Sequence, residues 1–296
     1  MKLTRLPDAE RRPRRIAVGT FDGVHLGHRE VIGDSDTVLT FEPHPSSVVA
    51  PQHTPRLLTS LEIKAERIAA LGVQEMIVIT FDAAFAARSA TQFVDDVLVG
   101  ALAASSVSVG ENFRFGHKAQ GDPALLLGDE RFTTRVAPLL ESGGEVISSS
   151  HIRALVLAGD VVRAAQLLGS AFELRGAVVH GDKRGRELGY PTANMVPDEQ
   201  LVLPGHGVYA CLADGRAAAV NVGVRPTFQT GRGELIEAFL IDWSGDLYSQ
   251  QLRLEFLERL RGERRFDSLD ALVEAMAGDV RRAREVCERA SLPGPS

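Results

Sequence analysis

Cysteine is scarce in this chain of 296 residues, which contains only Cys211 and Cys287. Two cysteines are too few for a disulfide framework and lack the C-x-x-C spacing of a zinc or redox site, so we expect a reducing cytoplasm. No stretch approaches about 18 uninterrupted apolar residues, and the polar, arginine-rich start lacks the apolar segment of a secretion signal. We therefore expect neither a signal peptide nor a membrane span.

An excess of basic charge is also lacking, because 33 Lys and Arg stand against 39 Asp and Glu, for a net charge of −6. Such a chain does not as a whole attract a nucleic-acid backbone, so we expect neither nucleic acid nor a membrane as a partner. A monomer or a weak homo-oligomer is expected. The arginines near the start are expected to be solvated: Arg11, Arg12, Arg14 and Arg15.

The composition that is present, 44% hydrophobic and 24% charged, is that of a folded globular protein, and the length suits about two domains. In the first half, short apolar runs alternate with helical stretches, which is typical of a parallel sheet with crossover helices. The predicted strands are 15–19, 37–41, 76–81 and 105–110, and the predicted helices are 61–71 and 89–104. Thr59 and Glu62 have the spacing of a capping box for the helix at 61–71.

A single helix is predicted over 151–168, with Gly169 at its end. Beyond it, short β-branched or aromatic runs predict an antiparallel barrel, and an amphipathic helix at 268–289 is predicted to pack on that barrel. The predicted barrel strands are 176–179, 207–212, 217–222, 235–241 and 251–256. We therefore predict an α/β domain at residues 15–169 and a β-barrel domain at residues 170–290.

Between residues 18 and 28 the chain leaves a predicted strand and enters a helix as V-G-T-F-D-G-V-H-L-G-H. Such a turn offers backbone N–H groups and a helix N-terminus to a phosphate, while His25 and His28 can donate hydrogen bonds to phosphoryl oxygens. A His pair of this spacing also fits a solvent-facing turn or a metal site. Its place after a buried strand favours nucleotide chemistry. The other residues expected to bind the nucleotide here are Gly19, Phe21, Asp22 and Gly23.

Two further segments, T-F-E-P-H-P at 40–45 and S-S-S-H-I-R at 148–153, also lie where a strand or loop meets a helix. In an open parallel sheet, ligands bind at the carboxyl ends of the strands. Ser149 and Ser150 fit plain helix capping, but together with Arg153 they make a better phosphate clamp. His44 fits either a core residue or a ligand.

Spaced glycines mark the second half of the chain and end in P-T-A-N at 191–194. Glycines let backbone N–H groups approach phosphates closely, although the series also fits the turns of a barrel. The oxygens of Thr192 and Asn194 are hard ligands suited to Mg²⁺. The glycines of the series are Gly176, Gly181, Gly185 and Gly189.

Glu237 lies in an alternating strand, in which Ile236, Ala238 and Leu240 share one face and Glu237 shares the other with Phe239. A carboxylate on such a face can accept the proton of an attacking hydroxyl, so Glu237 is predicted to be a general base. An exposed strand glutamate is the plainer alternative.

Over nearly its whole length, the chain resembles the prokaryotic bifunctional riboflavin kinase/FMN adenylyltransferase family. The resemblance lies in the segments 18–28, 40–45, 110–116 and 148–153, in P-T-A-N, and in the strand of Glu237. It implies a Rossmann-like nucleotidyltransferase sheet followed by a six-stranded antiparallel β-barrel with a C-terminal helix. It also implies that riboflavin is phosphorylated to FMN and that FMN is adenylylated to FAD, with ATP as co-substrate and Mg²⁺ as cofactor.

The same resemblance implies a role for each site residue. It places His25, His28 and Arg153 on the ATP phosphates in the adenylyl step, with Ser149 and Ser150 in the phosphate-binding segment. It makes Thr192 and Asn194 the ligands of Mg²⁺-ATP in the kinase step, and it assigns Asn112 and Arg225 to the flavin. Nucleotide binding in the barrel is assigned to Gly181, Gly185, Gly189 and Pro191.

The chain departs from the family pattern after His28, because only eight residues precede the strand that begins at Thr37. A parallel crossover usually takes a dozen or more residues. We therefore expect a stunted helix, an uncovered sheet face and displaced serines at 148–150. Two alternatives follow: a riboflavin kinase with an impaired adenylyltransferase half, or a flavin- or nucleotide-binding regulator without turnover.

Overall fold

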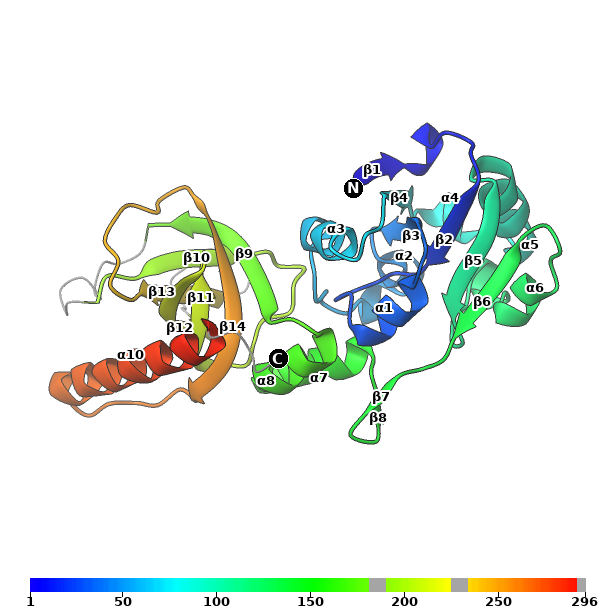
Figure 1. Cartoon of the computed structure of the whole chain (residues 1–296). Helices are drawn as coiled ribbons and strands as arrows, with labels where there is room; N and C mark the ends of the chain where they lie inside the picture. The colour runs from blue at the N-terminus through cyan, green and yellow to red at the C-terminus, as the bar shows by residue number, and fades with distance from the viewer. Residues whose placement is uncertain (181–189, 225–233, 292–296) are drawn as a thin grey trace. The chain divides into compact units, whose positions relative to one another are not determined.

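A computed structural model describes residues 1–180, 190–224 and 234–291 (Figure 1). The chain divides into two compact units, Met1–Ser149 and Ser150–Ser296, which are described separately. Among the described residues, no helix has the length and apolar character that crossing a bilayer demands.

The first unit is built on a six-stranded sheet in the order β1-β4-β3-β2-β5-β6, and every neighbouring pair is parallel (Figure 1). The four predicted strands are confirmed, with ends that differ by one residue at most. β1 and β6, at the two edges, were not predicted, because both segments are short and mostly polar. The strands are β1 (Lys2–Arg5), β2 (Arg14–Val18), β3 (Thr37–Glu42), β4 (Glu75–Thr80), β5 (Ala104–Gly110) and β6 (Thr133–Ala137).

Helices cover both faces of this sheet. On one face, Ala17, Val38 and Met76 pack against α1 (Leu26–Ile32) and α3 (Leu61–Ala69). On the other, Ile16, Leu39 and Ile77 pack against α5 (Ala90–Gln92) and the helix Phe93–Ala101 that continues it. The expectation of an uncovered sheet face is therefore wrong, because α3 shares the face that the short α1 covers in part.

Two local details differ from the sequence predictions. The hydroxyl of Ser60, not of Thr59, caps α3 by accepting a hydrogen bond from the Ile63 amide. The helix predicted at 89–104 becomes a π-helix over Phe93–Ala101, where the Leu102 amide donates to the Val97 carbonyl at 3.0 Å. The remaining short elements of this unit are η1 (Leu6–Asp8), α2 (Pro45–Val49), η2 (Pro51–His53), α4 (Ala83–Ala86), η4 (His117–Ala119), α6 (Pro123–Leu127), β7 (Glu141–Ser142) and β8 (Glu145–Val146).

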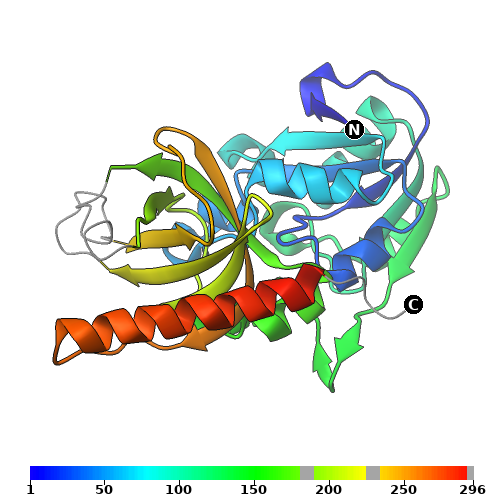
Figure 2. The ribbon, with the colours of Figure 1, turned by 60° about the vertical axis from the view of Figure 1, so that its left-hand side comes forward.

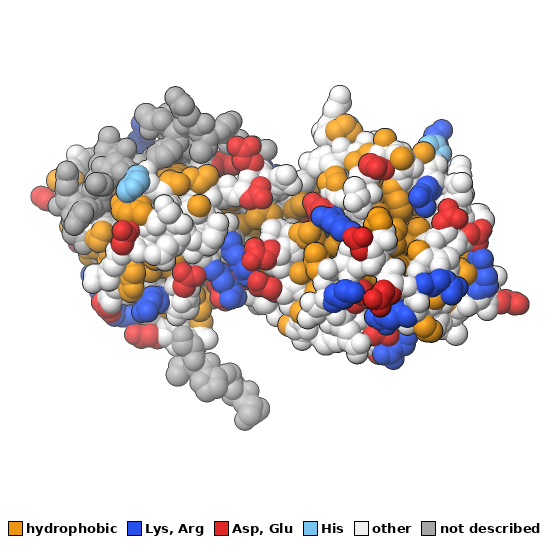
Figure 3. All heavy atoms as spheres, turned by 90° about the horizontal axis from the view of Figure 1, so that it is seen from above, with side chains coloured by type: hydrophobic (Ala, Val, Ile, Leu, Met, Phe, Trp, Pro, Cys, Tyr) orange, Lys and Arg blue, Asp and Glu red, His pale blue; other side chains and the backbone are white. Residues whose placement is uncertain are grey.

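The arginines near the start are paired rather than simply solvated. Arg14 is 1% exposed, and its guanidinium donates to Glu75 at 3.1 Å. Arg12 donates to the same carboxylate at 2.9 Å, and Arg15 bridges to Asp34. The expectation of solvated charge is therefore wrong for Arg14, whose partner lies 61 positions away. On the face shown in Figure 3, the basic and acidic side chains of the described residues are interspersed rather than gathered by sign.

The second unit begins with two helices, α7 (Ser149–Ala158) and α8 (Val161–Leu168), where a single helix was predicted. Gly159 separates them with a φ of 82°, a left-handed conformation that ends α7, and Asp160 caps α8 through the Arg163 amide. Gly169 then ends α8 with a φ of 72° in the predicted way.

The rest of this unit is a closed antiparallel barrel in the order β10-β13-β12-β11-β14-β9, which confirms the predicted fold class. The long helix α10 (Leu269–Ser291) lies along its outside, against β11, β12 and β14 (Figure 2). Val208, Ala283 and Val286 pack in the layer between barrel and helix. The strands are β9 (Phe172–Val179), β10 (Ala193–Pro197), β11 (Gly207–Ala213), β12 (Arg216–Val224), β13 (Glu234–Leu240) and β14 (Gln251–Arg261).

Candidate active sites in the two units

A large cavity lies at the carboxyl ends of the parallel strands. Within the sheet, β3 and β4 lie on one side of β2, and β5 lies on the other side of β2. The strand order therefore reverses between β2 and β5. Ligands bind at such a reversal in open α/β sheets. The cavity measures about 910 Å³, and its lining includes Gly19, Phe21, His28, Gly110 and Asn112. The segment predicted to bind a nucleotide therefore borders the point where this fold offers a site.

The turn after β2 is held in an unusual backbone conformation by side-chain hydrogen bonds. Phe21 and Gly23 have positive φ values of 49° and 90°. The buried carboxylate of Asp22 accepts hydrogen bonds from the amides of Leu58 at 2.8 Å and Thr59 at 3.2 Å. The Thr59 hydroxyl in turn accepts from the Gly23 amide at 3.0 Å. These bonds tie the turn to the segment that precedes α3.

His25 and His28 stack face to face at the start of α1, with ring centroids 3.5 Å apart and an interplanar angle of 18°. Nδ1 of His25 caps the helix by accepting from the His28 amide at 3.2 Å, so the neutral ring carries its proton on Nε2. His28 lines the cavity, and its buried Nδ1 has no hydrogen-bond partner among the described residues. A buried polar nitrogen without a partner, on a residue that lines a cavity, favours a ligand-binding role for that residue.

Burial keeps both imidazoles neutral at neutral pH. It lowers the pKa of His25 to about 4. The pKa of His28 lies well below its ordinary value because of burial first, then the nearby His25 and Lys64. Neutral rings act as N–H donors to phosphoryl oxygens. The alternative of a metal site finds no support in the described residues, since no three His, Cys, Asp or Glu side chains converge there.

Ser149 lies at this turn, because its hydroxyl donates to the Asp22 carbonyl at 2.9 Å. The expectation that the serines at 148–150 are displaced is therefore wrong for Ser149. This residue follows the β7–β8 hairpin in the chain and lies against the turn after β2. Ser150 and Arg153 follow in α7, within the second unit. Their predicted contact with phosphate stays a prediction.

The walls of the cavity combine aromatic rings with cationic groups. Asn112 follows β5 and lines the cavity, as its predicted role requires. His44 both caps a helix and lines the cavity. Its Nδ1 accepts a hydrogen bond from the Ser46 amide at 3.2 Å and so caps α2, and the residue is part of the cavity wall. Phe41, Phe113 and Phe115 lie in the segments 40–45 and 110–116 that carry the family resemblance. The place of Phe81, Phe85 and Phe93 in the wall was missed, because these residues fall outside those segments.

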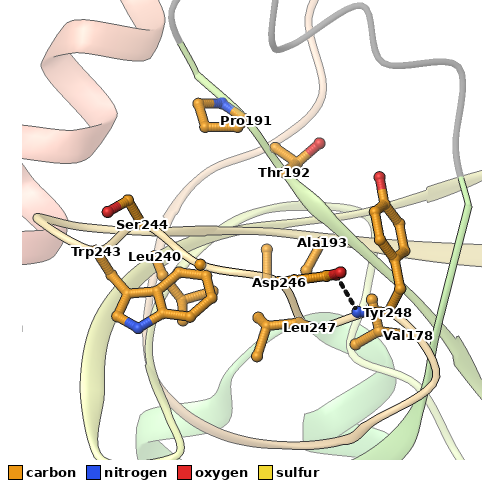
Figure 4. A pocket seen from close by; sticks show the side chains of 12 residues that line it. Val178, Pro191, Thr192, Ala193, Leu240, Trp243, Ser244, Asp246, Leu247 and Tyr248 are labelled. Atoms are coloured by element: carbon orange, nitrogen blue, oxygen red, sulfur yellow. Dashed lines mark hydrogen bonds between the residues drawn. The ribbon is translucent and has the colours of Figure 1, made fainter.

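The barrel carries two cavities of its own. The smaller, of about 320 Å³, lies between the segment Pro191–Thr192–Ala193 and the loop that contains Trp243 and Tyr248 (Figure 4). The larger, of about 680 Å³, lies between the outer barrel face and α10, and its lining includes Glu237. Thr192 lines both cavities. A group bound in one cavity can therefore meet a group bound in the other beside this threonine.

Glu237 stands in the middle of a polar row that crosses three strands. In the strand register it lies opposite Asn194 of β10 on one side and opposite Asn221 of β12 on the other. The predicted alternation is confirmed, because Ile236 and Ala238 are fully buried while Glu237 lines the larger cavity. Asn194 is 6% exposed, and its Oδ1 has no hydrogen-bond partner among the described residues.

Two family models match the chain, one in each half. The FAD synthetase model matches residues 8–151, and the riboflavin kinase model matches residues 168–287. The chain is 36% identical over 288 residues to the bifunctional riboflavin kinase/FMN adenylyltransferase of Bacillus subtilis, covering 90% of each chain. It is also 36% identical over 288 residues to the protein of that name from Escherichia coli K12, covering 91% of each chain. The chain belongs to the bifunctional riboflavin kinase/FMN adenylyltransferase family.

A crystal structure extends the likeness to the fold of both domains. A protein from Streptococcus pneumoniae, named a macrolide-efflux protein, superposes with a TM-score of 0.87 at 28% identity. The superposition covers 96% of this chain and 99% of that one. The activity in that name is said only of the Streptococcus protein. What the two chains share is the fold, over nearly the whole length of both.

Trp243 of the riboflavin kinase barrel escaped the sequence prediction, whereas the segment 246–248 resembles family positions around the flavin and nucleotide. Trp243 and Tyr248 line the smaller cavity, and the Tyr248 ring stacks on His180 at 3.9 Å between centroids. Asp246 shapes their loop by accepting from the Tyr248 amide at 2.9 Å (Figure 4). A single Trp in a polar loop gives no periodic signal. Four predicted residues lie outside the described ones: Gly181, Gly185, Gly189 and Arg225.

Proposed function

We propose that residues 170–290 phosphorylate riboflavin with ATP and that residues 15–169 adenylylate the resulting FMN to FAD. The observation that carries the kinase assignment is the meeting of two cavities at Thr192, beside Glu237. In that arrangement, ATP occupies the smaller cavity and riboflavin the larger one, between the barrel and α10. The cavity at the reversal of the parallel sheet, lined by His28, supports the adenylyltransferase assignment in the same way.

In the kinase step, Glu237 accepts the proton of the 5′-hydroxyl of riboflavin as its oxygen attacks the γ-phosphorus of ATP. The bond from that phosphorus to the β-phosphate oxygen breaks, and ADP leaves. Tyr190 and Phe239, whose rings meet edge to face at 5.2 Å, border the flavin cavity and orient the substrate.

A magnesium ion fits the residues beside this step. The buried Oδ1 of Asn194 has no hydrogen-bond partner among the described residues, and a hydroxyl and an amide oxygen suit an ion that takes few protein ligands. Thr192 and Asn194 would therefore hold Mg²⁺. The ion would supply positive charge that offsets the charge of the ATP phosphates.

In the adenylyl step, a phosphate oxygen of FMN attacks the α-phosphorus of ATP, and pyrophosphate leaves as the bond to the bridging oxygen breaks. The neutral rings of His25 and His28 donate hydrogen bonds to the developing charge, and Arg153 adds a cation. The aromatic wall of the cavity suits a flavin ring system. The protein's two cysteines, both buried and not joined in a disulfide, fit a reducing compartment and support a place in the cytoplasm.

The test is a chromatographic time course of the purified chain with riboflavin, ATP and Mg²⁺, which resolves riboflavin, FMN and FAD. We expect FMN to rise first and FAD to follow, and chelation of the metal with EDTA to abolish both products. If FMN stays the final product even when it is supplied directly, the adenylyltransferase assignment fails. If no FMN forms, the kinase assignment fails.

A further inference from the structure

The loop at residues 243–248 forms one wall of the smaller barrel cavity, and each of its residues lines that cavity (Figure 4). Its far end is fixed to the barrel, because the Ser249 amide donates to the Val178 carbonyl at 3.0 Å. Its near end follows Ile241 and Asp242, the two residues after β13. The place of these two residues therefore decides how the loop leaves the barrel.

Helix α10 holds both of them. Ile241 is 7% exposed and belongs to the same apolar cluster as Val280 and Ala283 of the helix. The carboxylate of Asp242 accepts two hydrogen bonds from the Arg284 guanidinium, from Nη1 to Oδ2 and from Nη2 to Oδ1, the latter at 3.1 Å. A bidentate pair of this kind fixes the orientation of the carboxylate as well as its distance. The loop thus starts from a point that the helix determines.

The backbone of Asp242 adds to this restraint. Its φ of 55° is a left-handed conformation that most side chains disfavour and that aspartate tolerates. The hydrogen bonds from Arg284 hold the pKa of the Asp242 carboxyl below its ordinary value, so the carboxylate is charged at neutral pH. An exposed ion pair contributes little to folding stability. The main effect of this one is therefore on the loop whose first turn it fixes.

The same face of α10 borders the larger cavity. Val280, one helical turn before Arg284, lines that cavity, and so does Met276, one turn earlier. β13 separates the two cavities, because Phe239 lines the larger one and Leu240 the smaller. One helix face thus walls the larger cavity and also carries the group that grips the loop of the smaller one.

We propose that Arg284 is a positioning residue for riboflavin phosphorylation: by clamping Asp242 it fixes the ATP-binding loop on the helix that walls the riboflavin cavity, and so sets the place of ATP relative to the hydroxyl that is phosphorylated. Arg284 is not among the residues that line either cavity, so it acts through the loop. This inference rests on the proposed kinase function, with ATP in the smaller cavity and riboflavin in the larger.

The test compares Arg284→Met with Arg284→Lys in the full chain, by initial rates of total FMN and FAD formation with each substrate varied. We expect Arg284→Met to raise the KM for ATP by about three- to fivefold, the upper part of what an exposed ion pair supplies. The KM for riboflavin should stay within about twofold of native, as should FAD formation from supplied FMN. Arg284→Lys keeps the charge but not the fork of two bonds, so its KM for ATP should lie in between.

Arg281→Met is the matched control, since Arg281 is an exposed arginine of the same helix for which the structure shows no ion pair with any described residue. All its kinetic constants should stay within about twofold of native. Trp243 is the only tryptophan of the chain, so its fluorescence anisotropy reports on the loop directly. The anisotropy should fall in Arg284→Met and remain native in Arg281→Met. A merely structural role of Arg284 would lower the melting temperature and leave the KM for ATP unchanged.

Asp242→Asn removes the charge at the other end of the pair, and asparagine tolerates the same left-handed φ. If the two side chains act as a unit, combining Asp242→Asn with Arg284→Met should raise the KM for ATP no further than either change alone. Should Arg284→Met fail to fold, Asp242→Asn replaces it in the comparison.

A native KM for ATP or a native Trp243 anisotropy in Arg284→Met would overturn the inference. Equal rises of that KM in Arg284→Met and Arg281→Met would also overturn it, as would additive effects in the double variant. A native chain that makes no FMN would instead overturn the proposed function.

Discussion

Glu237 occupies the centre of the kinase site as a strand residue on the side of β13 that faces the larger cavity. Its neighbours in the register are two amides, Asn194 and Asn221. A carboxylate that lines a cavity is placed to accept a proton from the hydroxyl of a bound substrate.

Replacing Glu237 with Gln is expected to lower kcat for riboflavin phosphorylation by about 10²–10⁴-fold, because the amide keeps the shape of the side chain but cannot accept the proton. FAD formation from supplied FMN should not change, since it takes place in the other domain. Chromatography of the products from riboflavin and from FMN measures both. Glu234→Gln, on the same strand and outside both cavity linings, is the matched control. Equal loss in the two variants would contradict the assignment of Glu237.

At the scale of elements, the second unit depends on a break between helices that the sequence pattern conceals. The apolar residues of α7 and α8 form one continuous helical pattern in the sequence. In the structure, Gly159 ends α7 with a φ of 82°. A Cβ at this position would lie 2.7 Å from the Tyr209 hydroxyl and 2.8 Å from Cδ of Arg259. The break is thus determined by barrel side chains that pack directly on the glycine.

Gly159→Ala is expected to destabilise the protein by about 2–3 kcal/mol, because it adds a steric clash to the strain of a positive φ. Gly215→Ala, with a φ of 77° and nothing within 4 Å of the added carbon, should cost only about 1 kcal/mol. Thermal and urea unfolding of the two variants measure the difference. A loss for Gly159→Ala no larger than that for Gly215→Ala would show that barrel packing does not impose the break.

At the scale of the whole molecule, each described cavity is lined by residues of one unit. The buried imidazoles belong to the FAD synthetase domain, so acid should act on the two halves differently. The pKa of His25 in the folded chain is about 4, below its ordinary value near 6.5. The unfolded chain therefore binds a proton more readily than the folded chain between these values.

Stability of the FAD synthetase domain should consequently be complete above about pH 6.5 and decline as the pH falls towards 4. The His25 contribution amounts to about 2 kcal/mol between pH 7.5 and pH 5. Hydrogen exchange of the parallel strands, followed by mass spectrometry at the two pH values, measures this loss. His25→Asn keeps a good helix cap without the titrating ring and should weaken the dependence. An unchanged dependence in that variant would assign the acid sensitivity to other groups.

The sequence by itself determined the order of the elements and most of the chemistry-bearing residues. Periodicity of apolar residues is local, so it predicted the parallel strands and most of the barrel, and the spacing of His25 and His28 predicted a phosphate turn. The family resemblance supplied the roles proposed for Thr192, Asn194 and Arg153. The short segment after His28 led to the wrong expectation of an uncovered sheet face. That face is covered by α3, which lies further along the chain and could not be placed from the local sequence.

Only the tertiary structure decided which charges are buried and what they serve. Arg14 and Lys64 look like ordinary surface residues in the sequence, yet both are buried, and Arg14 pairs with Glu75, 61 positions along the chain. The aromatic wall of the FAD synthetase cavity is likewise formed by residues from separate segments of the chain. The same holds for the two barrel cavities that Thr192 lines. Burial depends on contacts between segments that are distant in sequence, and no local pattern of residue types records those contacts.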